Sequence, residues 1–545
     1  MFKMMIWGVD FEQDLRPLIK AFYPGCDFAV QKEEIRENIG DTAEWLAFLG
    51  RCYPQVREGR TENGGLLKVQ ETGKGEEPPW GQRAAEDGKN EEPAFVPDFA
   101  FYLTGEEGYM AVRTGEVWLA DAFFGIRRQD DRRGYKNALM RPLYQLLEEV
   151  SGVHLPWGIL TGIRPTKQVL AQLEEGIPEE EIARFMREEY FCTEEKIATS
   201  LDVARTEHGI LQGIDYRDGY SLYIGIPFCP STCYYCSFTS YPVAAYGGRM
   251  EEYLEALFKE IRYAGGRGAV PGKSLQTIYV GGGTPTTLSE SQLDRLFTCM
   301  EEHLDMSRVQ EITVEAGRPD SITKEKLSVI RAHGISRISI NPQTMKQETL
   351  DLIGRRHSVE EIEKTFYLAR SLGFDNINMD MILGLANETP GDVAETLARI
   401  GKLAPDNLTV HTLAIKRAAR LNTNREEYEG LKAQGVQEML RLSREFAAAN
   451  GYHPYYLYRQ KNMTENLENV GYAKPGKEGL YNILIMEEKQ SIIAVGAGAT
   501  TKYVMPKQDQ IERVENVKSL KDYIERIDEM IERKEHFMSG HRGEL

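Results

Sequence analysis

Three closely spaced cysteines are the residues of this chain with the clearest chemistry. Cys229, Cys233 and Cys236 lie in the run Gly225-Ile-Pro-Phe-Cys-Pro-Ser-Thr-Cys-Tyr-Tyr-Cys-Ser-Phe238. Their thiolates can bind three irons of a [4Fe–4S] cube, which leaves the fourth iron without a local protein ligand. Because an open metal position can bind a substrate or a cofactor, the loop predicts an iron–sulfur cluster and a redox reaction.

Two other interpretations of these cysteines remain open on spacing alone: a zinc site and chance clustering. A structural zinc site usually has four ligands, often in two pairs, and the sequence offers no second cysteine pair. A disulfide framework is disfavoured, because the cysteine count is odd and we see no secretory signal. The remaining cysteines stand alone, as small core residues do, at Cys26, Cys52, Cys192 and Cys299.

The overall composition indicates a large globular protein with more than one domain. The chain has 545 residues, 41% of them hydrophobic, which is enough for a sizeable core. The net charge of −18 argues against nucleic acid as a main partner, since phosphate binding needs basic patches. No apolar run approaches the roughly 20 residues of a membrane span. We therefore expect a cytoplasmic protein without a membrane span.

The middle of the chain alternates between strand-like and helix-like segments. Amphipathic stretches, such as the one beginning at Met250, separate short apolar runs, and capping boxes begin at Ser289 and Ser358. About six strand–helix repeats predict a parallel sheet covered by helices, an incomplete (β/α)6-type barrel. The expected strands are Leu222–Ile226, Thr277–Val280, Glu311–Val314, Arg337–Ile340, Asn376–Ile382 and Leu408–Leu413.

Three regions are expected along the chain. Residues 1–215 should form an α+β N-terminal domain, with a flexible polar insertion near 58–95 that is rich in Gly, Glu, Lys and Pro. Residues 216–420 should form the barrel, and residues 421–545 a C-terminal α/β extension that covers the substrate. In the first region we expect strands at Phe99–Leu103 and Tyr109–Arg113, helices at Leu139–Val150 and Pro178–Tyr190, and either a packed connector or an anion contact at Trp157–Lys167.

Polar residues follow several of the predicted barrel strands. The run Gly281–Thr286 follows the second strand and offers backbone groups to a ligand, although a tight turn has the same composition. Glu315 follows the third strand, Gln343 follows the fourth, and Asp380 lies in the fifth. Because the carboxyl ends of parallel strands meet at one face of a barrel, we expect these groups beside the cysteine loop, in a ligand site.

The cysteine spacing, together with the run Gly-Gly-Gly-Thr-Pro-Thr, resembles the radical S-adenosylmethionine (SAM) superfamily. More narrowly, the region from about 220 to 500 resembles the oxygen-independent coproporphyrinogen III dehydrogenase family. The long N-terminal region, the segment Trp157–Lys167 and the segment Tyr455–Met463 resemble the HemZ-type branch of that family.

This resemblance implies a chemistry and a set of cofactor contacts. The three cysteines would hold a [4Fe–4S] cluster, SAM would bind the open iron, and SAM cleavage would give a 5′-deoxyadenosyl radical. In the family, that radical takes hydrogen from propionate side chains, which lose carbon dioxide, so that coproporphyrinogen III becomes protoporphyrinogen IX in heme biosynthesis. By motif position, Tyr223, Gly282 and Glu315 match contacts to the first SAM, and Tyr235, Gly283, Thr284, Gln343, Arg355, Asp380 and Ala414 match contacts to a second SAM.

The resemblance also implies partners for the reaction. These are a tetrapyrrole, either coproporphyrinogen III or a heme-like molecule, and a reductant such as flavodoxin or ferredoxin. A tyrosine-rich segment in the C-terminal region could hold a flat macrocycle and its carboxylates, or could pack as a strand at the barrel mouth. Its residues are Tyr455, Tyr456, Tyr458, Arg459, Gln460, Lys461 and Asn462.

Two positions depart from the pattern of the family's well-studied dehydrogenase. That enzyme has a histidine where this chain has Gly225, and a fourth cysteine where this chain has Phe238. The ending Cys236-Ser-Phe also approaches the Cys-Asp-Phe pattern of a related heme-chaperone branch. Two alternative functions therefore remain: a heme chaperone of the same family, and a radical SAM enzyme that acts on heme itself.

Overall fold

The computed structural model describes the chain as two compact units. Unit 1 comprises Met1–Gly162 and Glu179–Ala198, and unit 2 comprises Ile163–Pro178 and Thr199–Leu545. The division into three regions at about 215 and 420 stays a prediction, and most of the insertion expected near 58–95 lies outside the described residues. The described residues are 1–35, 39, 42–53, 57–58, 60–62, 65–67, 97–114, 117–123, 128–414, 435–459, 467–505 and 510–541.

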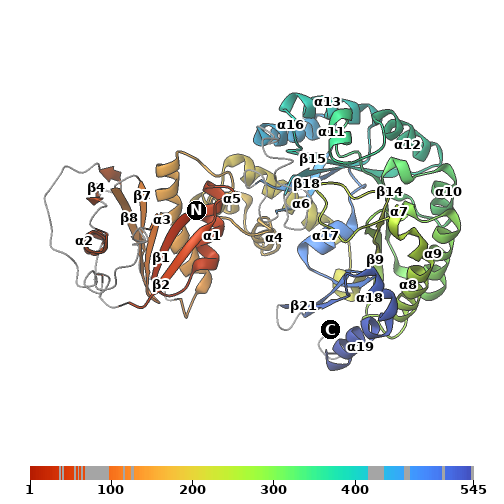
Figure 1. Ribbon diagram of the computed structural model, residues 1–545, viewed down its shortest axis with the longest axis horizontal. Helices are drawn as coiled ribbons and strands as arrows, with labels where there is room; N and C mark the ends of the chain where they lie inside the picture. The colour runs from red at the N-terminus through yellow and green to blue at the C-terminus, as the bar shows by residue number, and fades with distance from the viewer. Residues whose placement is uncertain are drawn as a thin grey trace, which may run out of the picture. The chain divides into compact units, whose positions relative to one another are not determined.

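Unit 1 is an α+β unit built on one mixed sheet (Figure 1). The strand order is β2-β1-β6-β7-β8-β3, in which β1 pairs in parallel with β2 and β6, while β6, β7 and β8 form an antiparallel meander. Trp7, Trp45 and Trp118 are buried in its core. Its main elements are β1 (Phe2–Gly8), α1 (Glu12–Phe22), β2 (Phe28–Glu33), α2 (Thr42–Cys52), β3 (Arg57–Glu58), β6 (Phe99–Leu103), β7 (Gly108–Thr114), β8 (Val117–Phe123), α3 (Arg132–Ser151) and α5 (Glu179–Tyr190).

The six parallel strands expected in the middle of the chain form the centre of an 11-stranded sheet in unit 2. Their order in the sheet, β9-β12-β13-β14-β15-β16, follows their order in the sequence, and helices cover the outer face of the curved sheet (Figure 1). The predicted incomplete parallel barrel is therefore confirmed. Its elements are β9 (Gly219–Ile226), α8 (Met250–Gly265), β12 (Ser274–Gly282), α9 (Glu290–His303), β13 (Glu311–Gly317), α10 (Lys324–Ala332), β14 (Arg337–Ile340), α11 (Gln347–Leu352), α12 (Val359–Ser371), β15 (Asn376–Leu383), α13 (Pro390–Leu403) and β16 (Asn407–Thr412).

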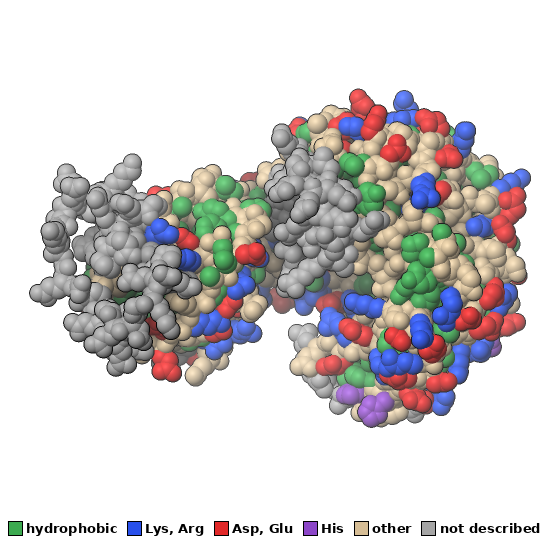
Figure 2. Space-filling model, viewed as in Figure 1, with side chains coloured by type: hydrophobic (Ala, Val, Ile, Leu, Met, Phe, Trp, Pro, Cys, Tyr) green, Lys and Arg blue, Asp and Glu red, His purple; other side chains and the backbone are tan. Residues whose placement is uncertain are grey.

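The local sequence explains where several of the barrel helices begin. Ser289 and Gln292 form a capping box at the start of α9, and Ser358 and Glu361 form one at the start of α12, as predicted. Each box satisfies backbone N–H groups that the first helical turn leaves without partners. On the face seen in Figure 2, the outer surface of unit 2 carries acidic and basic side chains together, as solvent-facing sides of amphipathic helices do.

C-terminal segments extend both edges of the six-stranded barrel. At the β16 edge, β18 and β17 continue the sheet in antiparallel pairing, and at the β9 edge β19 adds in parallel, followed by antiparallel β20 and β21. Within the described part of the chain, no helix has the length and apolar character required to span a membrane. The C-terminal elements are α16 (Val436–Ala449), β17 (His453–Tyr458), β18 (Asn469–Ala473), α17 (Leu480–Glu487), β19 (Ser491–Val495), β20 (Thr500–Met505), β21 (Gln510–Glu515), α18 (Leu520–Glu525) and α19 (Ile527–His541).

Helix α17 packs against the amino ends of the barrel strands. Glu311 begins β13, and its carboxylate accepts hydrogen bonds from the N–H groups of Leu480 at 2.7 Å and Tyr481 at 3.1 Å. Arg337, which begins β14, donates to the carbonyl of Lys477 at 2.8 Å, just before α17. An acidic group at a helix N-terminus is stabilising, because the exposed N–H groups carry partial positive charge. The opposite, carboxyl ends of the strands are the ends that carry the cysteine loop.

Candidate active site

The three cysteines lie in the loop that leaves β9 at the carboxyl end of the barrel. Cys233 is buried, Cys229 and Cys236 are half-buried, and all three are free thiols. Among the described residues, no three His, Cys, Asp or Glu side chains are grouped so that they could hold one metal ion. A cube is a different case, since each thiolate binds its own iron and the sulfurs need not converge on one point.

Backbone hydrogen bonds attach this cysteine loop to the glycine loop that follows β12. The N–H of Gly283 donates to the carbonyl of Ile226 at 2.8 Å, and the N–H of Thr284 donates to the carbonyl of Phe228 at 2.7 Å. The Thr284 hydroxyl lies 3.6 Å from the sulfur of Cys229 and donates to it. The two motifs that the sequence singled out therefore form one structural unit.

The thiols influence one another electrostatically. Burial raises the pKa of the Cys229 thiol to about 11; the hydrogen bond from Thr284 opposes this shift, and the neighbouring Cys236 and Cys233 add to it. A bound metal deprotonates coordinating thiols outright, so a raised thiol pKa does not prevent cluster binding. A set of three neighbouring soft sulfur donors fits an iron–sulfur cluster.

Gly283→Ala is expected to force the cysteine and glycine loops apart and to lower the cluster content. A Cβ atom at this position would lie 2.5 Å from the carbonyl oxygen of Phe228 and 2.8 Å from that of Ile226. Such overpacking costs about 1–3 kcal/mol. Iron and sulfide per chain after anaerobic reconstitution measure the effect. Gly248→Ala is the control, because a Cβ there meets nothing within 4 Å; equal iron content in both variants would contradict the prediction.

Glu315 lies near the carboxyl end of β13, half-buried beside other polar groups. The phenol of Tyr279 donates to its carboxylate at 2.6 Å. Burial raises the pKa of Glu315 to about 7; the hydrogen bond from Tyr279 opposes the rise, the nearby Asp380 adds to it, and the Gly282 N–H and His411 oppose it. The carboxyl group therefore changes its charge near neutral pH.

Ionisation of Glu315 is expected to make the protein less stable as the pH rises. The folded pKa of about 7 lies above the ordinary 4.5, so the folded state binds more protons between these values. The stabilising contribution is complete below the unfolded pKa and is lost as the pH rises through the folded pKa. The loss is about 2–3 kcal/mol, somewhat less than the full shift implies, because the group is half-buried.

Glu315→Gln tests this pH dependence, since an amide accepts from Tyr279 but does not titrate. Urea unfolding at about pH 5.5 and about pH 8 should show wild type losing more stability than the variant over that range. Parallel pH profiles would show that Glu315 is already ionised, and therefore solvated, at the lower pH.

A second polar group forms beside the cysteine loop, where Tyr235 meets Arg355. The buried Arg355 guanidinium donates from Nη2 to the Tyr235 phenol oxygen at 3.1 Å and from Nη1 to the carbonyl of Asn341 at 2.5 Å. Arg355 Nε and Gln343 Oε1 are buried, and neither has a hydrogen-bond partner among the described residues. Gln343 also has a left-handed backbone with φ of 68°, which is uncommon for a residue other than glycine. Buried polar atoms without partners indicate a place for a polar ligand.

Asp380, in β15, faces polar groups from its own strand and from β16. Asn378 donates to its carboxylate at 2.7 Å, and His411 Nε2 lies 3.8 Å from it. Burial raises the pKa of Asp380, but the nearby His411, the hydrogen bond from Asn378 and the nearby Thr409 hydroxyl outweigh burial and hold the pKa below its ordinary value. The group is therefore an anion at neutral pH. Ala414, the last of the predicted SAM contacts, follows the carboxyl end of β16.

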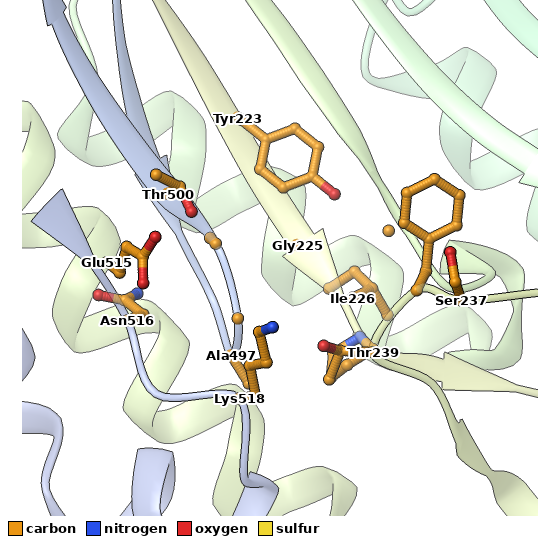
Figure 3. A pocket seen from close by; sticks show the side chains of 15 residues that line it. Tyr223, Gly225, Ile226, Ser237, Thr239, Ala497, Thr500, Glu515, Asn516 and Lys518 are labelled. Carbon is orange, nitrogen blue, oxygen red and sulfur yellow. The ribbon is translucent and has the colours of Figure 1, made fainter. Parts of the chain in front are cut away.

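An open cavity of about 310 Å³ lies between the cysteine loop and the strands added at the β9 edge (Figure 3). Tyr223 and Gly282, two of the predicted contacts to the first SAM, are among its lining residues. Gly225 and Phe238 line the same cavity, and Phe238 is 69% exposed. The two positions at which this chain departs from the well-studied dehydrogenase therefore face one space.

The tyrosine-rich segment forms the edge strand β17. Tyr455 and Tyr456 are buried; the Tyr455 phenol oxygen accepts from Asn482 at 3.1 Å, and the Tyr456 phenol donates to the Thr409 hydroxyl at 3.4 Å. For these two residues the packed-strand interpretation is the correct one. Gln460, Lys461 and Asn462 lie outside the described residues.

Arg164, in the segment Trp157–Lys167, contacts other residues of the protein. Its Nη2 lies 2.5 Å from the Glu488 carboxylate, and its Nη1 donates to the carbonyl of Met486 at 3.0 Å. The structure thus favours the packed connector over an anion contact at this arginine.

Two polar residues at the site, Arg318 and His411, were not predicted from the sequence. Arg318 follows β13 directly, and His411 lies inside β16. The sequence signal for Arg318 was its place in the run Arg-Pro-Asp, immediately after a barrel strand. A charged residue at that position is expected either to stay in solvent or to have a polar partner, because burying an unpaired charge is costly. His411 offered a similar signal, as a titratable residue within an apolar strand-like run.

The sequence matches a known family and several known proteins. The family model of the radical SAM superfamily matches residues 223–400. The chain is 41% identical over 402 residues to the oxygen-independent coproporphyrinogen-III oxidase-like protein HemZ of Bacillus subtilis, covering 73% of this chain and 80% of HemZ. It is 31% identical to the heme chaperone HemW of the same organism, over 51% of this chain and 70% of HemW. The solved structure of Escherichia coli coproporphyrinogen III oxidase HemN aligns with 59% of this chain and 72% of HemN, at 26% identity and a TM-score of 0.47.

The partial barrel and its cysteine loop thus define a radical SAM protein. Within that superfamily the chain belongs to the oxygen-independent coproporphyrinogen III oxidase-like family, which contains HemZ and is related to the HemW chaperones. Membership of the superfamily implies a [4Fe–4S] cluster and SAM as cofactors.

Proposed function

We propose that this chain is a radical SAM coproporphyrinogen III dehydrogenase, which forms protoporphyrinogen IX without oxygen. When bound, the cluster and SAM supply a 5′-deoxyadenosyl radical that takes one hydrogen atom from a propionate side chain. That side chain then loses carbon dioxide and one electron and becomes a vinyl group, and two such events complete the reaction. The electron that cleaves SAM comes from a reductant such as flavodoxin or ferredoxin, and the released electron needs an acceptor outside the chain.

The observation that carries this proposal is the attachment of the cysteine loop to the glycine loop at the barrel mouth. In our proposal Cys229, Cys233 and Cys236 hold the cluster. Tyr223, Gly282 and Glu315 bind the first SAM, with Tyr223 and Gly282 in the cavity and Glu315 on the neighbouring strand. Carboxylates accept hydrogen bonds from amino and hydroxyl groups, both of which SAM carries.

The buried atoms without partners support a second SAM. Arg355 Nε is a charged donor suited to a carboxylate, and Gln343 Oε1 is an acceptor suited to an amino or hydroxyl group. The ionised Asp380 adds an acceptor on a neighbouring strand. Tyr235, Gly283, Thr284 and Ala414 complete the proposed set. Two hydrogen abstractions per substrate give a chemical reason for two SAM molecules.

A heme-chaperone function is the second candidate, and the cavity supplies the observation that favours it. Phe238 stands exposed at the cavity edge where the well-studied dehydrogenase has a cysteine, and the glycine at 225 leaves space where that enzyme has a histidine. An exposed aromatic ring beside an open cavity suits a flat apolar ligand such as heme.

Anaerobic turnover with dithionite, SAM and coproporphyrinogen III tests the proposal. Mass analysis should show product that has lost two carboxyl groups, together with 5′-deoxyadenosine. If 5′-deoxyadenosine forms while the porphyrinogen stays intact, the proposed substrate is wrong. Stoichiometric heme binding without vinyl formation would favour the chaperone, whereas consumption of heme with release of iron would favour an enzyme that acts on heme itself.

A further inference from the structure

We infer that Arg318 is a positioning residue that fixes the loop around Cys233 and raises the reduction potential of the cluster bound there. This inference rests on the proposed cluster but adds a residue to which no cofactor contact was assigned. Its evidence is the set of contacts made by one buried guanidinium.

Arg318 is 3% exposed, and its side chain spans from its own loop to the cysteine loop. Its Nη1 donates to the carbonyl of Ser231 at 3.0 Å and to the Ser231 hydroxyl at 2.8 Å. The same nitrogen lies 3.8 Å from the sulfur of Cys233 and donates to it. The other edge of the guanidinium donates from Nε and Nη2 to the two carboxylate oxygens of Asp320, at 3.0 Å and 2.6 Å.

The cysteine loop is held at the same place by a third segment of the chain. The Ser231 hydroxyl, which accepts from Arg318, itself donates to the carbonyl of Gly354 at 3.0 Å. The N–H of Tyr234 donates to the carbonyl of Ile353 at 3.2 Å. Ser231 therefore joins Arg318 to the loop before Arg355, and the residues on both sides of Cys233 are fixed.

The Arg318–Asp320 pair is oriented with its positive end toward the sulfur. Burial raises the pKa of Asp320, but the nearby His357 and the hydrogen bonds from Arg318 outweigh burial and hold the pKa well below its usual range. His357, fully buried, lies 3.8 Å from the Asp320 carboxylate. Asp320 is therefore ionised at neutral pH. Its carboxylate accepts from Nε and Nη2 of Arg318, which leaves Nη1 of Arg318 directed at the cysteine loop.

An oriented cation beside a cluster ligand has a predictable electrostatic effect. Reduction adds one negative charge to the cluster, and a nearby buried positive charge stabilises the reduced form. A hydrogen bond to a ligating sulfur acts in the same direction, since it withdraws electron density from the thiolate. Lysine at position 318 cannot make all of these contacts. The planar guanidinium binds Asp320 on one side and Ser231 on the other, whereas an ammonium is a single point charge.

The test compares Arg318→Met, Arg318→Lys and Asp320→Asn with wild type in the full-length protein, reconstituted anaerobically. The midpoint potential is measured by redox titration with dithionite, followed by the electron paramagnetic resonance signal of the reduced cluster. At a fixed potential, Arg318→Met should lower the ratio of reduced to oxidised cluster about tenfold, a shift of about 59 mV to a more negative potential. Arg318→Lys should show a smaller shift in the same direction, because lysine keeps the positive charge. Asp320→Asn should move the potential in the opposite direction, because it leaves the cation without its counter-charge.

Opposite shifts in Arg318→Met and Asp320→Asn separate an electrostatic role from a structural one. A purely structural role predicts the same change in both variants, and that result, or an unchanged potential in Arg318→Lys and Asp320→Asn, overturns the inference. Arg295→Met is the control, since Arg295, on α9, contacts residues of α8: it makes exposed ion pairs with Glu251 and Glu255 and lies over the Phe258 ring. If wild type itself binds no cluster, the proposed function fails, and the inference about Arg318, which rests on it, fails as well.

Discussion

Cys233→Ala is expected to give a folded protein that carries no iron–sulfur cluster after anaerobic reconstitution. Cys233 is the middle cysteine of the three, and it is the most deeply buried of them. Removing its sulfur leaves one iron of a cube without a protein ligand, in addition to the iron that has none already. Iron and sulfide content and the brown absorbance measure the loss.

The fold should survive this substitution, because the loop is held mainly through backbone groups. The N–H of Cys236 donates to the carbonyl of residue 233, and the N–H of Tyr234 donates to Ile353, neither of which needs the Cys233 side chain. Cys299→Ala is the matched control, a buried free cysteine on α9 in the same unit. An intact cube in Cys233→Ala would show that the ligand assignment is wrong.

Lys534→Met is expected to destabilise unit 2 by about 3–5 kcal/mol, because it leaves a buried carboxylate without its counter-charge. The Lys534 ammonium lies 2.6 Å from the Glu260 carboxylate, and both side chains are essentially inaccessible to solvent. The same carboxylate accepts from Tyr523 at 2.5 Å and from the N–H of Gly496 at 2.8 Å. The network thus ties α8, α18 and α19 to the turn after β19, which lies at the cavity.

Urea unfolding followed by far-UV circular dichroism measures this loss. The double variant Glu260→Leu/Lys534→Met should be more stable than Lys534→Met alone, since it leaves no unpaired charge. Arg533→Gln is the control, because its ion pair with Glu529 on the same helix is solvent-exposed and should contribute little. If Lys534→Met and Arg533→Gln behave alike, the buried network does not stabilise unit 2 as we propose.

The barrel could be predicted because its signals are local and repeated. Short β-branched runs alternate with amphipathic helices, and the capping boxes at Ser289 and Ser358 are complete within four residues. The parallel topology then follows, since strands joined by helices pair in parallel. Because the carboxyl ends of parallel strands meet at one face of a barrel, the topology alone predicted that Glu315 and Asp380 lie near each other.

The rest of the site depended on contacts between residues that lie far apart in the sequence. Arg318 reaches Ser231 across 87 positions, and Lys534 reaches Glu260 across 274. No local pattern records such pairs, so sequence analysis could not assign a partner to either residue. The same limit explains the tyrosine-rich segment: composition allowed both a ligand contact and a packed strand, and only the neighbours of Tyr455 and Tyr456 distinguish them.

Transfer of deuterium from a labelled propionate into 5′-deoxyadenosine tests the central claim most directly. Coproporphyrinogen III deuterated on its propionate side chains is incubated anaerobically with the reconstituted protein, dithionite and SAM. We predict 5′-deoxyadenosine that carries deuterium, together with a product that has gained vinyl groups and lost carbon dioxide. Unlabelled 5′-deoxyadenosine, formed while the propionates keep their deuterium, would contradict the account.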